Sequence, residues 1–315
     1  MIAKIKEIIN KYWRILKDAA NGFSDDKGMK LSSALAYSTI FSLPPMLLLI
    51  IVFAGTFYGK DAVEGKVFIE LRRIFDDSEI ALQIQDVIRG LQKQRNSTMA
   101  TIIGSIALII GSTGIFVEIQ DSLNMIWGVR PRAKKGIIKF LLNRVISFSM
   151  IIGLGFLLIV SLIINALLIA LSSKLVEWFP GLPLNLLNFI NSGLIFLVLS
   201  FLFSVIFKML PDVRIRWKQV WPGSIVTAGL FLVGKFVIGI YISQNKTVSL
   251  YGTASSIIIL LLWIYFSSAI LYFGAEFTRA YIEYHGKRIV PNSYAEYSDK
   301  RILKHLREDE TKEKT

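Results

Sequence analysis

Cysteine is absent from the 315 residues, and histidine occurs only twice, as His285 and His305. Without cysteine there can be no disulfide, no thiolate catalysis and no cysteine-ligated metal. Both histidines lie in the C-terminal region outside the apolar runs, which argues against a histidine-based metal or catalytic cluster within a membrane. The sequence also shows neither a phosphate-binding glycine-rich loop nor a nucleophile paired with a base. We therefore expect no catalytic residues, no metal and no cofactor, and we expect that the protein is not an enzyme.

Apolar sequence is abundant. The chain is 53% hydrophobic with a mean hydropathy of +0.54, values typical of a polytopic membrane protein. From Gly252 to Ala275 no residue is charged. A helix of that length measures about 36 Å, which is enough to cross a hydrocarbon core of about 30 Å with some tilt. This stretch predicts a transmembrane helix.

The same pattern recurs along the chain and predicts an all-α polytopic membrane protein with six transmembrane helices. An N-terminal amphipathic helix and an extracytoplasmic helical hairpin complete the expected fold. The transmembrane domain covers residues 31–280. Its six spans are expected at 31–57, 99–127, 144–172, 185–209, 220–242 and 252–280.

Residues 1–30 are expected to form a cytoplasmic segment that lies on the membrane surface. Between residues 2 and 18, apolar side chains follow a helical stripe, and lysine and arginine lie largely on the other side. A basic amphipathic helix of this kind suits an anionic membrane surface. The alternative is a helix docked on loops of the protein. No cleavage site follows a short apolar segment here, so the first span should act as an uncleaved anchor.

The distribution of lysine and arginine predicts the topology. If the N-terminus is cytoplasmic, the cytoplasmic segments hold 26 of the 36 basic residues and the external segments hold 9. This bias places both termini of a multi-pass membrane protein in the cytoplasm. It also accounts for the net charge of +13 without a nucleic-acid partner.

Two segments flank or interrupt the spans. The first external loop, 58–98, has seven basic and seven acidic residues, and its apolar periodicity predicts two amphipathic helices that cap the outer face. The tail, 281–315, is polar and mixed in charge and is expected to be cytoplasmic, with disordered last residues.

The first span contains Pro44 and Pro45. Proline lacks the backbone donor and clashes with the preceding turn, so these residues should break the helix midway. The carbonyl groups that the break frees need water or polar neighbours. We therefore expect the break to line an internal cavity.

Six motifs stand out along the chain: LSSALAYSTIFSLPPMLLL from residue 31, IQDSLNMIWGV from residue 119, LPDVRIRWKQVWPGS from residue 210, GKFVIGIYI from residue 234, YGTASS from residue 251 and LLWIYFSSAILYFGAEF from residue 261. These motifs resemble those of the BrkB/YihY family of bacterial inner-membrane proteins, once labelled ribonuclease BN, and the resemblance implies a location in the bacterial inner membrane. The likeness runs from about Lys30 to Tyr281. One departure is Thr278, where many relatives have asparagine.

The resemblance implies a six-helix bundle with both termini in the cytoplasm, in agreement with the independent charge count. It also implies an envelope protein that is discussed as a transporter of lipids or lipid-like molecules, or as a virulence factor. The ribonuclease label looks like a misassignment.

Five residues are candidates for substrate binding because ionisable and amide groups within spans usually face an interior or a watery cavity. Each has a structural alternative: capping at the membrane edge for the acids of the second span, snorkelling to the outer headgroups for Lys235, and an ion pair with Arg279 for Glu276. The candidates are Lys235, Glu118, Asp121, Asn124 and Glu276.

Three functions remain open from the sequence. The first is a transporter or flippase-like protein for lipids or other amphipathic molecules, with membrane lipids as partners and an anionic headgroup favoured by Lys235. The second is a structural scaffold of the envelope that transports nothing. A ribonuclease is the least favoured, because topology already explains the basic loops. The substrate, the energy source and the oligomeric state are not encoded in any motif of the sequence.

Overall fold

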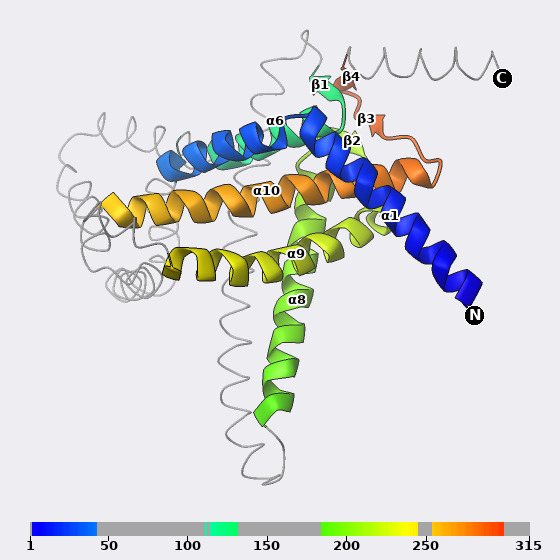
Figure 1. Cartoon of the computed structure of the whole chain (residues 1–315). Helices are drawn as coiled ribbons and strands as arrows, with labels where there is room; N and C mark the ends of the chain where they lie inside the picture. Colours follow the sequence, from blue (N-terminus) through cyan, green and yellow to red (C-terminus); the bar gives the residue numbers. More distant parts are fainter. Residues whose placement is uncertain (1, 43–110, 112–113, 132–183, 245–253, 299–315) are drawn as a thin grey trace, which may run out of the picture. The chain divides into compact units, whose positions relative to one another are not determined.

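The computed structural model describes residues 2–42, 111, 114–131, 184–244 and 254–298, which are mostly helical (Figure 1). Residues 28–42 are also helical. The named helices are α1 (Ile2–Asp25), α6 (Gly114–Ile126), α8 (Leu184–Met209), α9 (Trp217–Gln244) and α10 (Ala254–Tyr284). The strands are β1 (Val129–Pro131), β2 (Val213–Arg214), β3 (Val290–Pro291) and β4 (Ala295–Tyr297).

Three of the expected spans, 185–209, 220–242 and 252–280, coincide with α8, α9 and α10 apart from a few residues at their ends. Among the residues that the structure describes, two stretches are long and apolar enough to cross a membrane, Trp217–Ile240 and Ile258–Tyr284, and Ile195–Met209 is a shorter apolar helix. The span expected at 144–172, the capping helices of 58–98 and the break at Pro44 and Pro45 lie outside the described residues.

The chain divides into two compact units. The first comprises Met1–Gly28, Gln120–Val233 and Ile270–Thr315, and the second comprises Met29–Ile119 and Gly234–Ala269. The first unit contains the polar clusters that concern function.

Helices α9 and α10 approach closely through a reciprocal pair of glycine and threonine residues. A methyl group on Gly223 would lie 2.8 Å from Cβ and 3.0 Å from Cα of Thr278, and one on Gly274 would lie 2.8 Å from Cβ of Thr227. Each threonine hydroxyl donates to the carbonyl of the glycine four residues earlier in its own helix, at 2.6 Å for Thr227 and 2.8 Å for Thr278. Small residues at i and i+4 on both helices therefore bring the two backbones together.

The Thr278 side chain is fully buried in this crossing. Thr278 is the position where many members of the resembled family have asparagine. In the structure, the Thr278 hydroxyl bonds the backbone of its own helix. Its role is therefore to pack α10 against α9.

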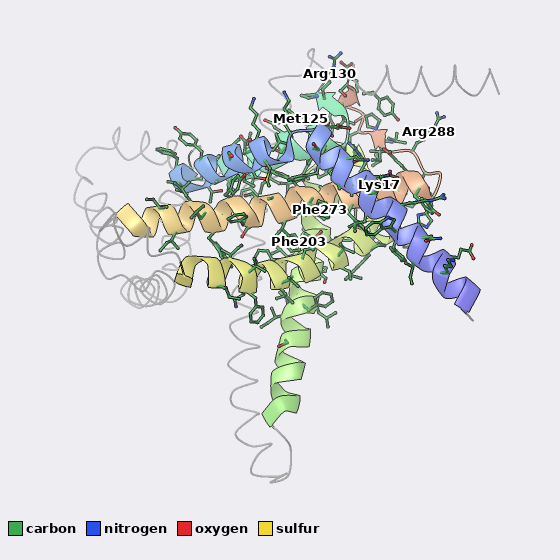
Figure 2. All side chains as sticks on the ribbon, in the orientation of Figure 1. Lys17, Met125, Arg130, Phe203, Phe273 and Arg288 are labelled. Atoms are coloured by element: carbon green, nitrogen blue, oxygen red, sulfur yellow. The ribbon has the colours of Figure 1, made fainter. Side chains whose placement is uncertain are left out.

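Helix α1 has an apolar face that packs on α10 and a second apolar face that does not. Ile15 and Ala19 form a buried cluster with Phe277 and Ala280. On the same helix Trp13 is 66% exposed, and Ile9 and Leu16 are exposed as well. The expected amphipathic helix of residues 2–18 thus extends to Asp25, and basic residues such as Lys17 flank its exposed apolar face (Figure 2).

Aromatic contacts continue the packing in the first unit. Phe23, near the end of α1, meets Phe273 of α10 edge to face with ring centroids 6.0 Å apart. Phe203 of α8 meets Phe231 of α9 in the same way at 5.9 Å; Figure 2 labels Phe203 and Phe273. Edge-to-face pairs of this kind add to the burial of apolar area.

After α10 the chain turns back and pairs with two loops. Gly128 and Gly286, which follow α6 and α10, have positive φ values of 67° and 64°, the backbone conformation that commonly ends helices. Strand β4 pairs antiparallel with β1, and β3 pairs antiparallel with β2. The sequence predicted only a polar tail from residue 281, and these strands within it were missed.

In the second unit, helical residues 29–42 approach the start of α6. A methyl group on Gly114 would lie 2.7 Å from the Ser42 hydroxyl oxygen. Thr39 is buried and donates to the carbonyl of Leu35 at 2.7 Å. Here too a glycine permits close contact between helical segments.

Candidate functional site

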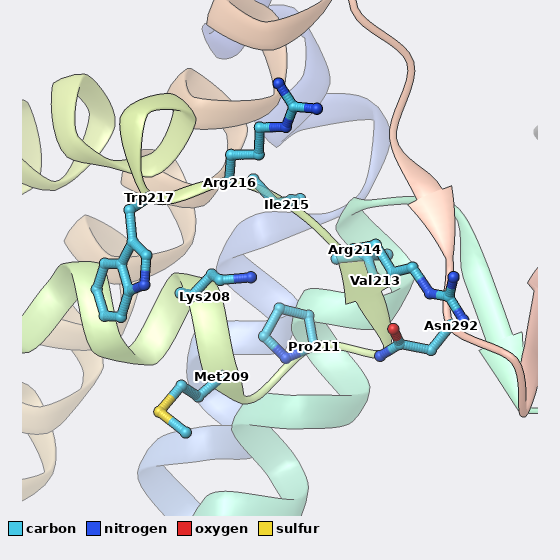
Figure 3. A pocket seen from close by; sticks show the side chains of 9 residues that line it. All are labelled: Lys208, Met209, Pro211, Val213, Arg214, Ile215, Arg216, Trp217 and Asn292. Carbon is cyan, nitrogen blue, oxygen red and sulfur yellow. The ribbon is translucent and has the colours of Figure 1, made fainter.

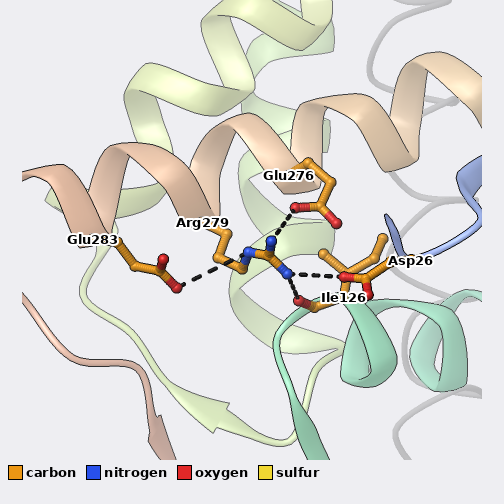
Figure 4. Close-up of polar contacts among 5 residues, drawn as sticks. All are labelled: Asp26, Ile126, Glu276, Arg279 and Glu283. Atoms are coloured by element: carbon orange, nitrogen blue, oxygen red, sulfur yellow. Dashed lines mark hydrogen bonds and ion pairs between the residues drawn. The ribbon is translucent and has the colours of Figure 1, made fainter. Parts of the chain in front are cut away.

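The candidate site of the first unit is centred on Arg279 of α10 (Figure 4). Its guanidinium contacts Asp26 Oδ2 at 2.9 Å through Nη1, Glu276 Oε2 at 3.1 Å through Nη2 and Glu283 Oε1 at 4.0 Å through Nε. Three carboxylates therefore converge on one guanidinium. We call these four residues and the Ile126 carbonyl the Arg279 cluster.

Helix periodicity and helix ends assemble this cluster. Glu276, Arg279 and Glu283 are three and four residues apart, so they share one face of α10. Asp26 comes from the turn that follows α1. Ile126 is the last residue of α6, and its carbonyl accepts a hydrogen bond from Arg279 Nη1 at 2.5 Å. The last carbonyls of a helix lack partners within it and attract cations, so Arg279 caps α6 while it holds Asp26.

The cluster is largely withdrawn from solvent. The side chains of Glu276, Asp26 and Arg279 are 1%, 7% and 16% exposed. A methyl group on Gly22 would lie 2.5 Å from Glu276 Oε2 and 2.7 Å from Arg279 Nη2, so α1 passes directly over the ion pair. Breaking a buried ion pair by removing one partner typically costs about 3–5 kcal/mol. Chemically, the cluster is a clamp that joins α1, α6 and α10.

A second buried polar group centres on Asp212, in the loop between α8 and α9. Gln120 donates to its Oδ1 at 3.0 Å and Asn124 donates to its Oδ2 at 2.9 Å. Asn124 also accepts the backbone N–H of Asp212 at 2.8 Å, and the Asp212 carbonyl accepts the backbone N–H of Asn292 at 2.9 Å. This arrangement fixes the loop to α6 and to the segment after α10.

Tyr294 lies beside this group. Burial of its phenol and the neighbouring Asp212 carboxylate both raise its pKa above the ordinary value. Asn292 Nδ2 donates to the Tyr294 hydroxyl at 3.1 Å. A neutral phenol is therefore favoured next to the buried carboxylate.

The five predicted site residues have different surroundings. Glu276 is buried in the Arg279 cluster, and Asn124 is buried against Asp212. Glu118 is half-buried and Asp121 is exposed, both on α6. Lys235 is exposed on α9, and its neighbours Phe236 and Val237 are 74% and 60% exposed. The structure thus gives protein partners to Glu276 and Asn124, and the role of all five residues in binding substrate stays a prediction.

The sequence anticipated the pairing of Glu276 with Arg279. It did not anticipate that Arg279 also pairs with Asp26 and Glu283. Asp26 and Asp212 were both missed. A signal was present for Asp212, because it is the single acidic residue between Lys208 and Lys218 in an otherwise basic loop.

Within the part of the chain that the structure describes, no three histidine, aspartate or glutamate residues are placed to hold a metal ion. The contacts of the Arg279 cluster are ion pairs and hydrogen bonds that join helix ends.

Comparison with known proteins shows to which family the chain belongs. The family model described as "Virulence factor BrkB" matches residues 19–296. The chain belongs to the BrkB family. This confirms the resemblance inferred from the sequence motifs, and the matched range contains both the Arg279 cluster and the Asp212 group.

Curated relatives are named UPF0761 membrane proteins. One from Delftia acidovorans is 28% identical over 81% of this chain and 59% of its own length. One from Alteromonas mediterranea is 26% identical over 87% of this chain and 91% of its own length. The chain thus spans about three fifths of the first relative and most of the second. No solved structure matches the chain significantly. The protein is an integral membrane protein of this family.

Proposed function

We propose that the protein is a multi-pass carrier in the bacterial inner membrane that moves lipids or other amphipathic molecules and catalyses no covalent reaction. The observation that carries the proposal is the buried Arg279 cluster at one end of the apolar stretch Ile258–Tyr284. Ionisable groups in membrane-spanning segments are costly and commonly mark transport paths. A protein with only a scaffold role could join the same helices through apolar contacts, without buried charges.

The cluster suits a gate because its contacts are polar and reversible. Arg279 holds Asp26 beside α1 and the end of α6 at the same time. Parting those contacts would free three helix segments together, and packed interfaces of this kind switch between two discrete arrangements. In this proposal the described arrangement is the closed state at the cytoplasmic end.

Reconstitution into liposomes with lipids that carry a fluorescent headgroup label tests the proposal. A membrane-impermeant quencher then measures how fast labelled lipid moves from the inner to the outer leaflet. We expect faster movement than in protein-free liposomes, and we expect Glu276→Gln to alter that rate. Glu296→Gln is the matched control, because it removes an acid from the exposed pair with Arg130.

The outcomes separate transport from the alternatives. Lipid movement no faster than in protein-free liposomes, with a correctly inserted protein, would favour the envelope scaffold. RNA cleavage that persists in purified protein and responds to chelators would favour the ribonuclease. Equal rates for wild type, Glu276→Gln and Glu296→Gln would leave transport standing but would reject the cluster as its gate.

The proposed topology has six spans with both termini in the cytoplasm, on the basis of the bias of 26 to 9 basic residues. Reporter fusions after Lys135 and Lys218 should report a cytoplasmic location. Fusions after Lys174 and Lys246 should report an external one. The reverse pattern would overturn the topology.

A further inference from the structure

A pocket of about 510 Å³ lies at the loop that joins α8 to α9, in the first unit (Figure 3). It opens between the last turn of α8 and the first residue of α9, and Asn292 closes one side. Neither the Arg279 cluster nor any of the five predicted site residues lines it. The lining residues are Lys208, Met209, Pro211, Val213, Arg214, Ile215, Arg216, Trp217 and Asn292.

The charge of this lining is entirely positive. Lys208, Arg214 and Arg216 contribute three cations, and no lining residue is acidic. Among the described residues none of these three side chains forms an ion pair with a carboxylate. The acid of the same loop, Asp212, is 1% exposed and accepts hydrogen bonds from Gln120 and Asn124. The pocket therefore presents unneutralised positive charge.

The geometry of the cations suits a ligand that is broader than a single ion. Figure 3 shows Lys208 extending from α8 towards the loop that contains β2. Arg214 extends from this loop towards Asn292, and Arg216 lies on another side of the loop. Arg214 and Arg216 are both exposed. Guanidinium groups bind phosphate oxygens through paired hydrogen bonds, and lysine binds them as a point charge.

The position of the pocket indicates the source of such a ligand. It lies where the apolar helix Ile195–Met209 ends and the candidate span Trp217–Ile240 begins, so it is at the boundary between hydrocarbon and water. Trp217 is 42% exposed and Met209 is 56% exposed beside the cations. Tryptophan favours the headgroup level of a membrane, and basic pockets between spans bind anionic headgroups.

We propose that this pocket binds an anionic lipid headgroup, with the cations spread around the headgroup and Trp217 and Met209 against the start of the acyl chains. The site does not depend on transport, because a lipid held there can anchor the loop whether or not the protein moves it.

Lipid binding to the full-length protein in zwitterionic detergent tests the site. Native mass spectrometry measures how much dioleoyl phosphatidylglycerol stays bound, with zwitterionic phosphatidylcholine, which has no net charge, as the comparison. We expect retention of phosphatidylglycerol, and we expect Lys208→Gln and Arg214→Gln each to weaken it by about tenfold, since each removes a charge-assisted hydrogen bond. Lys218→Gln is the matched control, because it removes the same charge from the neighbouring helical turn without lining the pocket.

Two soluble ligands identify the source of the phosphate. Inorganic phosphate and glycerol phosphate, added at millimolar concentration, should compete only weakly with the lipid if the acyl chains contribute. Full displacement by either would overturn the lipid assignment in favour of a soluble phosphate compound. Equal losses in Lys218→Gln and Lys208→Gln would also overturn the proposal, because binding would then follow total charge and not the pocket.

A further pair of variants keeps the test valid if a glutamine variant fails to fold. Arg214→Lys retains the charge and should keep most of the lipid. Trp217→Phe leaves every cation in place and should shorten retention through loss of the interfacial contact. Unchanged lipid binding in all of the lining variants, each verified as folded by circular dichroism, would reject the site.

Discussion

Gly223→Ala tests the closest contact in the described structure, the crossing of α9 and α10. The added methyl group would lie 2.8 Å from Cβ and 3.0 Å from Cα of Thr278. A rotamer change can move the Thr278 hydroxyl but not its Cα, so the helices must separate. Overpacking of this kind costs about 1–3 kcal/mol, against about 1 kcal/mol gained because alanine favours helix more than glycine does. Because the contact involves backbone, we expect the upper part of that range and a net loss of about 1–2 kcal/mol.

Gly239→Ala is the matched control on the same helix. A methyl group at Gly239 would meet no atom within 4 Å, so only the gain in helix preference applies. The two variants should therefore differ by about 2–3 kcal/mol. The assay is the apparent melting temperature in one detergent at one heating rate, because membrane proteins often unfold irreversibly.

At about 2–4 °C for each kcal/mol, the expected gap between the two variants is roughly 4–12 °C, with Gly223→Ala the less stable. Combining Gly223→Ala with Thr278→Ala should restore part of the loss, since the two changes act on one contact. A Gly223→Ala protein as stable as wild type would refute the close approach of α9 and α10.

Two further predictions concern the polar clusters. Arg279→Gln should lower the free energy of unfolding by about 3–5 kcal/mol, because it leaves buried carboxylates without their cation. Its control, Arg130→Gln, should change the free energy of unfolding by less than about 1 kcal/mol, because the side chains of the Arg130–Glu296 pair are 48% and 42% exposed. Chemical unfolding in detergent measures both variants. Asp212→Asn should cost about 1–3 kcal/mol, since its new amide would face the amides of Gln120 and Asn124 that now donate to the carboxylate. Limited proteolysis of the α8–α9 loop should then speed up, and an unchanged digestion rate would contradict the role given to Asp212.

The sequence by itself determined the class of protein and the extent of three helices. Long uncharged runs leave few structures available in a membrane, because every backbone polar group must be paired within its own segment. The limits of α8, α9 and α10 therefore follow closely from hydropathy and charge. The sequence motifs also predicted the family correctly, and they lie within the matched range of 19–296.

Only the tertiary structure decided which polar residues meet. Glu276 and Arg279 are neighbours on one helix, so periodicity anticipated their pairing. Asp26 lies 253 positions from Arg279 in the sequence, and Asn124 lies 88 positions from Asp212. A local sequence pattern cannot predict contacts between residues so far apart along the chain. The same holds for the basic pocket, whose cations are ordinary loop charges in the sequence. They line one pocket because the ends of α8 and α9 lie close together, while the nearby carboxylate of Asp212 bonds to Gln120 of α6.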